Sequence, residues 1–237
     1  MKKEYWYIII AYISMHLSNF IGVPAVYFIG TWMGGNPEKL EMLAGPYWLV
    51  ISFVTALVVI LFLLRKEWGL ASRNAASWPM SFTWAFLGIF LALFSQYIAA
   101  NIELLFGIEV GSDNTSNIMD MIEQFTLMIL VSSIIGPILE EIVFRKIIFG
   151  SLHKRFNFLI SALASSVIFA SAHGEFEHII LYSAIGFTFA YLYVKTNRII
   201  VPILTHVGMN TFAVVSQFLY REGLNKEVQA FIGGIFL

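Results

Sequence analysis

Residues 47–64, YWLVISFVTALVVILFLL, decide the class of fold, because these eighteen consecutive residues include no charged side chain. A transmembrane helix needs about 20 predominantly apolar residues to cross the hydrocarbon core of a bilayer. Six other segments of the chain are also apolar over most of their length. The seven segments are 5–30, 47–64, 79–104, 118–150, 157–173, 178–194 and 199–219. We therefore predict an all-α, polytopic transmembrane helix bundle of about seven spans, within a range of six to eight.

The composition of the whole chain agrees with this class. Of the 237 residues, 59% are hydrophobic and 12% are charged, whereas a soluble domain has about 25% charged residues. The scarcity of charge argues against a soluble enzyme, and the net charge of −1 offers no basic surface for nucleic acid. The chain contains no cysteine, which excludes disulfides, thiolate metal sites and a cysteine nucleophile. We expect one integral-membrane domain over residues 1–237.

Charged residues gather between the apolar segments, and their sign alternates from one loop to the next. The basic positions are Lys2, Lys3, Arg65, Lys66, Arg73, Lys154, Arg155, Lys195 and Arg198. Acidic residues mark the intervening loops at Glu109, Asp113, Glu175 and Glu177. Because short basic loops stay on the cytoplasmic side, the alternation predicts a cytoplasmic N-terminus. The long first and fourth segments leave room for a further helix, and the tail 231–237 is too short to span a membrane.

The fourth apolar segment contains three ionisable residues within six positions. They are Glu140, Glu141 and Arg145. Ionisable groups inside a membrane span are costly, so they are candidates for a functional site. Glu141 and Arg145 are four residues apart with the acid first, which favours an ion pair on a helix. Glu140 lies about 100° away around the helix, so we predict a structural Glu141–Arg145 pair and a freer carboxylate at Glu140. The start of this segment is amphipathic, which suits either a helix at the membrane interface or the protruding end of a long span.

Two later segments place pairs of residues on one helical face. Phe169 and His173 are four residues apart, and so are His206 and Asn210. At about 1.5 Å per helical residue, these polar groups and Glu140 lie at depths that tilted helices can bring together. The sequence therefore predicts one polar cluster within the membrane.

Prolines and a turn shape this predicted cluster. The fourth and fifth segments meet at a turn near 153–156, which makes them an antiparallel hairpin. Pro137 precedes Glu140 by three residues, and Pro202 precedes His206 by four. Proline removes a backbone hydrogen bond and bends a helix. We therefore predict that both helices bend and open a cavity beside the polar residues.

A carboxylate, two histidines and an amide suit the hydrolysis of a peptide bond. Glu140 would deprotonate a water molecule, and His173 would orient that water or bind the carbonyl. His206 with Asn210 would donate hydrogen bonds to the oxyanion. A zinc ion held by Glu140, His173 and His206 is an alternative, but a metal-free mechanism uses all four residues and is preferred. The competing functions are a peptide-binding scaffold that does not cleave and an ion-coupled transporter.

Three motifs, taken together and in this order, carry a resemblance to a known family. They are Glu140-Glu141-x-x-x-Arg145, Phe169-x-x-x-His173 and His206-x-x-x-Asn210. The chain resembles the CPBP family of intramembrane proteases, also called Abi, over a core of about 118–220. This family includes CAAX prenyl endopeptidases and bacteriocin-processing or immunity proteins. The resemblance implies an intramembrane polar cavity and endopeptidase activity.

The resemblance also assigns roles to the motif residues. It implies that Glu140, His173, His206 and Asn210 are catalytic and that Glu141, Arg145 and Phe169 support the site. It leaves a glutamic mechanism without a cofactor and a zinc-dependent mechanism both open. The implied partners are membrane lipid and a peptide or lipidated peptide, as in CAAX-type, leader-peptide or bacteriocin processing. A bacteriocin immunity protein of the same fold is the alternative, and the chain's small size indicates a prokaryotic cell membrane.

Overall fold

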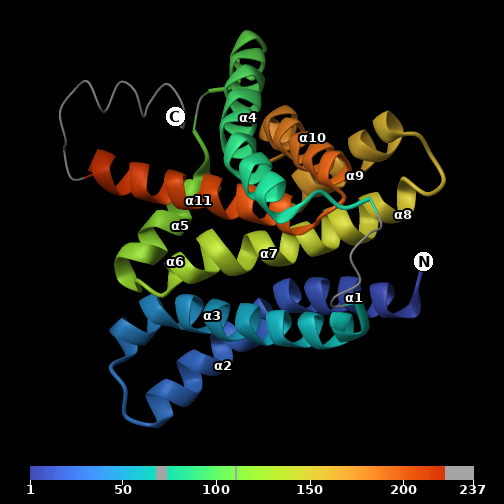
Figure 1. Cartoon of the computed structure of the whole chain (residues 1–237). Helices are drawn as coiled ribbons and strands as arrows, with labels where there is room; N and C mark the ends of the chain where they lie inside the picture. Colours follow the sequence, from blue (N-terminus) through green and yellow to red (C-terminus); the bar gives the residue numbers. More distant parts are fainter. Residues whose placement is uncertain (68–73, 110, 222–237) are drawn as a thin grey trace. The chain divides into compact units, whose positions relative to one another are not determined.

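A computed structural model describes residues 1–67, 74–109 and 111–221 (Figure 1), and all regular structure in these residues is helical. The α-helices are α1 (Lys3–Leu17), α2 (Asn19–Trp32), α3 (Pro37–Leu64), α4 (Trp78–Leu105), α5 (Asp113–Gln124), α6 (Met128–Leu130), α7 (Gly136–Glu140), α8 (Gly150–Leu152), α9 (Phe158–Ala172), α10 (Ile179–Thr196) and α11 (Ile200–Arg221). Two 3-10 helices are η1 (Arg65–Glu67) and η4 (Phe176–His178), and two π-helices are η2 (Val131–Ile135) and η3 (Glu141–Phe149). Arg73 and the tail 231–237, which the sequence analysis used, lie outside the described residues.

Four helical stretches in the described part of the chain are long and apolar enough to cross a membrane. They are Pro37–Glu67, Trp78–Leu105, Phe176–Thr196 and Ile200–Arg221. The helices α1 and α2 add a fifth if they form one span with a bend of 47°. The predicted count of seven is therefore not reached by this test. The shortfall has two causes, because α9 has only 15 residues and the fourth predicted segment is not one regular helix.

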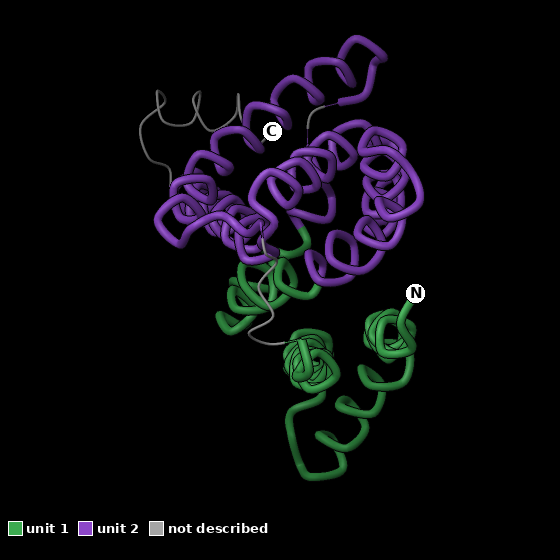
Figure 2. Tube along the Cα trace, turned by 45° about the vertical axis from the view of Figure 1, so that its right-hand side comes forward, with its two compact units in different colours: residues 1–70, 117–139 green, residues 71–116, 140–237 purple. Residues whose placement is uncertain are grey.

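The described residues form two compact units, coloured separately in Figure 2. In unit 1 (residues 1–70 and 117–139), α1 and α2 pack against α3. Ser18 is the residue between α1 and α2, and its Oγ accepts a hydrogen bond from the indole N–H of Trp48 at 3.0 Å. Gly22 lies against the Trp48 ring, where any side chain would overlap the indole. The first predicted segment therefore contains two helices that are bent at Ser18.

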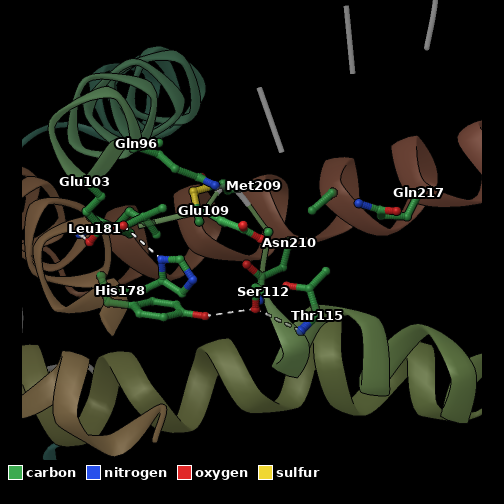
Figure 3. Close-up of a pocket in the computed structure, with 15 residues that line it drawn as sticks. Gln96, Glu103, Glu109, Ser112, Thr115, His178, Leu181, Met209, Asn210 and Gln217 are labelled. Atoms are coloured by element: carbon green, nitrogen blue, oxygen red, sulfur yellow. Dashed lines mark hydrogen bonds and ion pairs between the residues drawn. The ribbon is translucent and has the colours of Figure 1, made fainter. Parts of the chain in front are cut away.

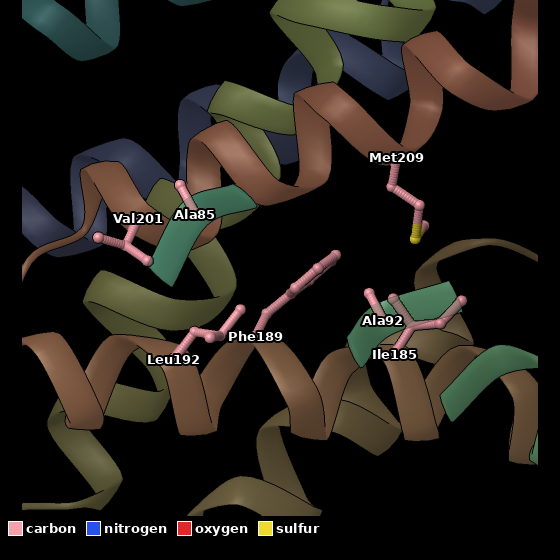
Figure 4. Close-up of a cluster of buried hydrophobic side chains, with 7 residues drawn as sticks. All are labelled: Ala85, Ala92, Ile185, Phe189, Leu192, Val201 and Met209. Carbon is pink, nitrogen blue, oxygen red and sulfur yellow. The ribbon is translucent and has the colours of Figure 1, made fainter. Parts of the chain in front are cut away.

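Unit 2 (residues 71–116 and 140–237) contains every residue of the predicted site. The helix α10 packs against α4 and α9, and α11 packs against α4. A methyl group added at Gly88 would lie 2.5 Å from Thr205 Oγ1, so glycine allows α4 to approach α11 closely. Figure 4 shows the buried apolar cluster that α4, α10 and α11 share, made of Ala85, Ala92, Ile185, Phe189, Leu192, Val201 and Met209.

The helix α4 also carries a row of exposed aromatic side chains. They are Phe82, Phe86, Phe90 and Phe94, each more than half exposed. Residues four apart share one face of a helix, so these rings form a continuous apolar stripe. Such a stripe is unfavourable in water and suits contact with lipid acyl chains.

The fourth predicted segment begins with the amphipathic helix that the sequence predicts. In α5, Met119 and Ile122 are buried, whereas Asp120 and Glu123 are exposed. The chain is then helical from residue 128 to residue 152, but it alternates between α and π geometry.

Pro137 explains the first π-helix. Its ring crowds the carbonyl four residues earlier and it has no N–H to donate, so the wider turn of η2 directly before it relieves the clash. The second π-helix, η3, follows Glu140 and was not predicted. Because π turns are rare and are found frequently at functional sites, η3 indicates that its own residues belong to a functional site.

The other predicted bend is wrong, whereas the predicted turn is confirmed. Pro202 is the third residue of α11, which runs to Arg221 as one helix. The N–H groups of the first turn have no partner within a helix, so proline is tolerated there without a bend. The turn expected near 153–156 lies between Leu152, where α8 ends, and Phe158, where α9 begins.

Candidate active site

The predicted ion pair is present and lies at the start of η3. Arg145 Nε is 3.3 Å from Glu141 Oε2, and the two side chains are 1% and 0% exposed. Charges removed from water in this way are tolerated only when they are paired. Each of these two buried charges therefore needs the other to offset the cost of its removal from water.

Aromatic rings hold the arginine on its other sides. The guanidinium carbon of Arg145 lies 4.1 Å from the centre of the Phe169 ring and 5.2 Å from that of Phe189. Both distances are within the range of cation–π attraction. A methyl group added at Gly186 would lie 3.1 Å from Arg145 Nη2, so the glycine leaves room on α10 for the arginine side chain. Phe169, predicted as a supporting residue, thus contacts the buried cation directly.

His206 lies between the two adjacent glutamates. Its Nδ1 is 2.9 Å from Glu141 Oε1, and its Nε2 is 3.8 Å from Glu140 Oε2. A carboxylate paired with arginine accepts hydrogen bonds only, so Nδ1 carries the proton that it shares with Glu141. Nε2 is therefore the nitrogen that His206 turns towards Glu140. Glu141 orients a histidine in addition to pairing with Arg145, a second role that the sequence did not reveal.

The two glutamates differ in accessibility, as predicted. The side chain of Glu141 is fully buried, whereas that of Glu140 is 21% exposed. Glu140 ends α7 at the junction with η3. The carboxylate of Glu140 is therefore the one that a substrate or a water molecule can reach.

His173 follows the last residue of α9, and its ring has a defined orientation. Its Nδ1 is 2.9 Å from the carbonyl oxygen of Phe169. A carbonyl only accepts, so Nδ1 carries the hydrogen and Nε2 is left as an acceptor. The His173 ring is 4.6 Å from the Phe169 ring and 4.2 Å from the Tyr182 ring. Phe169 also lies 6.1 Å from the His206 ring, so it contacts both histidines of the predicted site.

Asn210 lies one turn beyond His206 on α11 and lines a cavity of about 140 Å³ (Figure 3). The remaining lining residues come from α4, the linker to α5, α5, η4, α10 and α11, and they are Gln96, Ala100, Glu103, Glu109, Gly111, Ser112, Thr115, His178, Leu181, Tyr182, Ile185, Met209, Ala213 and Gln217. Figure 3 shows Gln96 on the opposite side of this cavity from Ser112 and Thr115. The cavity shares Asn210 and Tyr182 with the surroundings of the predicted catalytic residues.

A second buried acid–histidine contact lies in the wall of this cavity and was missed by the sequence analysis. Glu103, which is 2% exposed, has Oε2 2.9 Å from His178 Nδ1 and accepts the Leu181 N–H at 2.8 Å. The signal was available, because Glu103 is an ionisable residue within the apolar segment 79–104. It has no partner at helical spacing, and His178 is 75 positions away.

Glu175, in the loop after His173, forms hydrogen bonds with the linker before α5 and with the first turn of α5. Its carboxylate accepts hydrogen bonds from Tyr182 Oη at 2.6 Å, from the Asn114 N–H at 2.8 Å and from Ser112 Oγ at 2.9 Å. Burial opposes ionisation of Glu175, but these hydrogen bonds and the nearby His178 outweigh it and hold its pKa below the ordinary value. Glu175 is therefore an ionised anchor at neutral pH.

The arrangement of side chains does not support the zinc site that the sequence left open. In the described part of the chain, no group of three or more histidine, aspartate or glutamate residues is placed to hold a metal ion. The Nδ1 atoms of His173 and His206 contact Phe169 and Glu141, which leaves Nε2 as the available nitrogen of each ring. A histidine binds a metal through one nitrogen, so it is the placement of the side chains that argues against the site. Glu140, His173 and His206 do not fit a three-ligand metal site in this arrangement.

Apolar helices with a buried carboxylate–histidine cluster define an integral membrane protein with a polar site inside it. Comparison with known proteins gives the family. The type II CAAX prenyl endopeptidase Rce1-like family matches residues 122–212, a range that includes all three motifs. The chain belongs to this family of membrane CAAX-type proteases, also called CPBP.

Three relatives are similar to the chain over most of its length. The chain is 49% identical to the candidate membrane peptidase YdiL of Bacillus subtilis (strain 168), over 100% of both chains. It is 34% identical to the membrane-embedded CAAX protease MroQ of Staphylococcus aureus (strain USA300), over 80% of this chain and 81% of that protein. It is 27% identical to the UPF0177 protein YxdF of Lactococcus lactis subsp. lactis (strain IL1403), over 67% and 90%. No solved structure matches the chain.

Proposed function

We propose that this chain is an intramembrane endopeptidase in which Glu140 activates a water molecule to hydrolyse a peptide bond. The observation that carries the proposal is the different environment of two adjacent carboxylates. Glu141 is buried against Arg145 and His206, whereas Glu140 is 21% exposed and has His206 Nε2 3.8 Å away. A partly exposed carboxylate beside an oriented histidine is suited to act as a general base.

The proposed reaction begins with proton transfer from water to the Glu140 carboxylate. The water oxygen forms a bond to the peptide carbonyl carbon, and the carbonyl oxygen becomes an oxyanion. Glu140 then returns the proton to the nitrogen of the leaving amine as the carbon–nitrogen bond breaks. Glu140 ends the cycle as the carboxylate with which it began.

The neighbouring residues take complementary roles in this proposal. The acceptor Nε2 of His173 orients the attacking water through one of its hydrogens. The amide of Asn210 donates a hydrogen bond to the oxyanion, and His206 assists when Nε2 is protonated. Arg145 and Phe169 hold Glu141 and the histidines in place. No step uses a metal ion or another cofactor.

The proposed substrate is a membrane-associated or lipidated peptide, of the CAAX, leader-peptide or bacteriocin kind. Two observations support it. A cavity of about 140 Å³ lies beside Asn210, one of the proposed catalytic residues, and a relative at 34% identity is named a membrane-embedded CAAX protease. We further propose one integral-membrane domain in a prokaryotic cell membrane, with a cytoplasmic N-terminus and about seven crossings that include α9 and the helical residues 128–152.

Peptide cleavage by purified protein in detergent tests this function. The substrates are a prenylated CAAX peptide and a set of hydrophobic leader peptides, and mass spectrometry identifies the products. Wild type is expected to cleave at least one of them, while Glu140→Ala, His173→Ala and His206→Ala fold and do not. Glu38→Gln, at an exposed glutamate in the first turn of α3, is the matched control and should cleave like wild type. Binding of these peptides without any product would instead favour the scaffold or immunity function.

A further inference from the structure

We propose that Tyr182 and Glu175 are positioning residues for His173, and that together they set the ring orientation that the catalytic step requires. The inference rests on the proposed function, because it concerns the histidine that orients the attacking water. It adds two residues that lie outside the three motifs.

The position of His173 explains why such help is needed. His173 follows the end of α9 and is itself followed by Gly174 with φ +77°, so the helix does not continue beyond it. The Nδ1 contact with the Phe169 carbonyl tethers one edge of the ring. A single hydrogen bond leaves the ring free to tilt about that contact. Further contacts must therefore fix the ring plane.

Tyr182 supplies the missing constraint on the plane. The Tyr182 and His173 rings are stacked, with centres 4.2 Å apart and an angle of 23° between their planes. Phe169 contacts His173 with its ring turned by 69° at 4.6 Å. A stacked partner on one side and an edge-on partner on another are both favourable aromatic geometries. Together they allow one orientation, in which Nε2 is the nitrogen that remains available.

Glu175 fixes Tyr182 in turn. The Tyr182 hydroxyl donates to Glu175 Oε2 at 2.6 Å, which is the length of a strong charge-assisted bond. Glu175 is itself held by the Asn114 N–H and by Ser112 Oγ, at 2.8 and 2.9 Å. The hydroxyl end of the tyrosine is thus anchored through Glu175 to Ser112 and Asn114, which are far from His173 in sequence.

Tyr182 also lines the cavity beside Asn210, so a direct contact with substrate is the competing role. The two roles separate in the kinetics. A residue that positions His173 acts on the chemical step and lowers kcat, whereas a residue that only binds substrate raises KM. Misplacement of a catalytic group by about 1 Å can cost a hundredfold in rate.

The kinetic test uses full-length protein in detergent with the peptide that wild type cleaves. We expect Tyr182→Leu to lower kcat by about tenfold to a hundredfold with KM unchanged. Tyr182→Phe keeps the ring and should retain more activity than Tyr182→Leu, and Glu175→Gln should resemble Tyr182→Phe. Tyr193→Leu removes a half-buried tyrosine from the same helix, where its ring contacts Phe149, and should behave like wild type. A raised KM with unchanged kcat in Tyr182→Leu would overturn the positioning role.

A spectroscopic test does not depend on any peptidase activity. In protein labelled at histidine, the ring signal of His173 is assigned by its loss in His173→Gln. Removal of the stacked ring in Tyr182→Leu should shift that signal, because the tyrosine shields it, whereas Tyr193→Leu should not. If His173 gives the same signal in Tyr182→Leu and wild type, the positioning proposal is wrong even in an active enzyme. If the signal shifts but no peptide is cleaved by wild type, the positioning stands and the proposed function fails.

Discussion

Removal of the Arg145 charge should destabilise this protein far more than removal of an exposed charge that makes a shorter ion pair. Arg145→Met keeps much of the length of the side chain and deletes the guanidinium. It leaves Glu141, which is 0% exposed, with His206 but without its cation. Two cation–π contacts, at 4.1 and 5.2 Å, are lost as well.

The loss in free energy of unfolding depends on how deeply each ion pair is buried and not on the distance between its atoms. Breaking a buried ion pair by removing one partner costs about 3–5 kcal/mol, because the other charge stays buried. The matched control is Lys2→Met, which breaks the pair between Lys2 Nζ and Glu67 Oε1. That pair is shorter, at 2.6 Å, but Lys2 is 57% exposed, so its loss should cost about 0–1 kcal/mol.

The assay is SDS-induced unfolding of purified protein in mixed micelles, followed by circular dichroism. Arg145→Met should lower the free energy of unfolding by several kcal/mol relative to Lys2→Met. The double variant Glu141→Leu/Arg145→Met removes both buried charges, so it should be more stable than Arg145→Met alone. Equal unfolding curves for Arg145→Met and Lys2→Met would refute the reasoning that burial sets the strength of these pairs.

Three further predictions follow from single contacts. Gly186→Ala places a methyl group 3.1 Å from Arg145 Nη2, so thermal denaturation should show a free energy of unfolding lowered by about 1–3 kcal/mol. Gly45→Ala is the control, because nothing lies within 4 Å of the added methyl group, and it should show no loss from steric overlap. Glu103→Leu leaves the buried His178 without its carboxylate and should cost about 1–3 kcal/mol in the same measurement; a neutral effect would show that the pair contributes nothing to the fold. The lowered pKa of Glu175 means that its ionisation stabilises the fold above the unfolded-state pKa of about 4.3 and that this contribution is lost as the pH falls through the lower folded-state pKa. Unfolding curves between neutral and acid pH should therefore converge for wild type and Glu175→Gln, and a constant difference would contradict the assignment.

The local part of the site could be predicted from the sequence, because residues four apart on a helix are neighbours. This spacing gave the Glu141–Arg145 pair and placed Phe169 beside His173. The difference in exposure between Glu140 and Glu141 also followed from helix geometry. Each of these features depends only on the shape of one helix.

Contacts between distant helices could not be predicted in the same way. His206 and Glu141 are 65 positions apart, and His178 and Glu103 are 75 apart. Hydrophobic periodicity gives the face of a helix but not the partner against which it packs. The second role of Glu141 and the whole Glu103–His178 contact therefore emerged only from the fold.

Backbone geometry was the other source of error. A bend was predicted at both Pro137 and Pro202, although of these two prolines only Pro137 lies in the interior of a helical run. Its neighbourhood adopts π turns, which no hydrophobic pattern indicates. The same irregular turns, and the short α9, explain why fewer helices than expected have the length and composition of a membrane span.

Two neighbouring variants, Glu140→Gln and Glu141→Gln, separate the proposed general base from the buried ion pair when they are compared in peptide cleavage and in SDS-induced unfolding. We predict that Glu140→Gln keeps the wild-type unfolding curve and loses about 10²–10⁴-fold in kcat/KM, because a general base is removed from a partly exposed position. Glu141→Gln should shift the unfolding curve, because it weakens the buried pair with Arg145. Cleavage at the wild-type rate by folded Glu140→Gln protein would contradict the central claim that Glu140 activates the water.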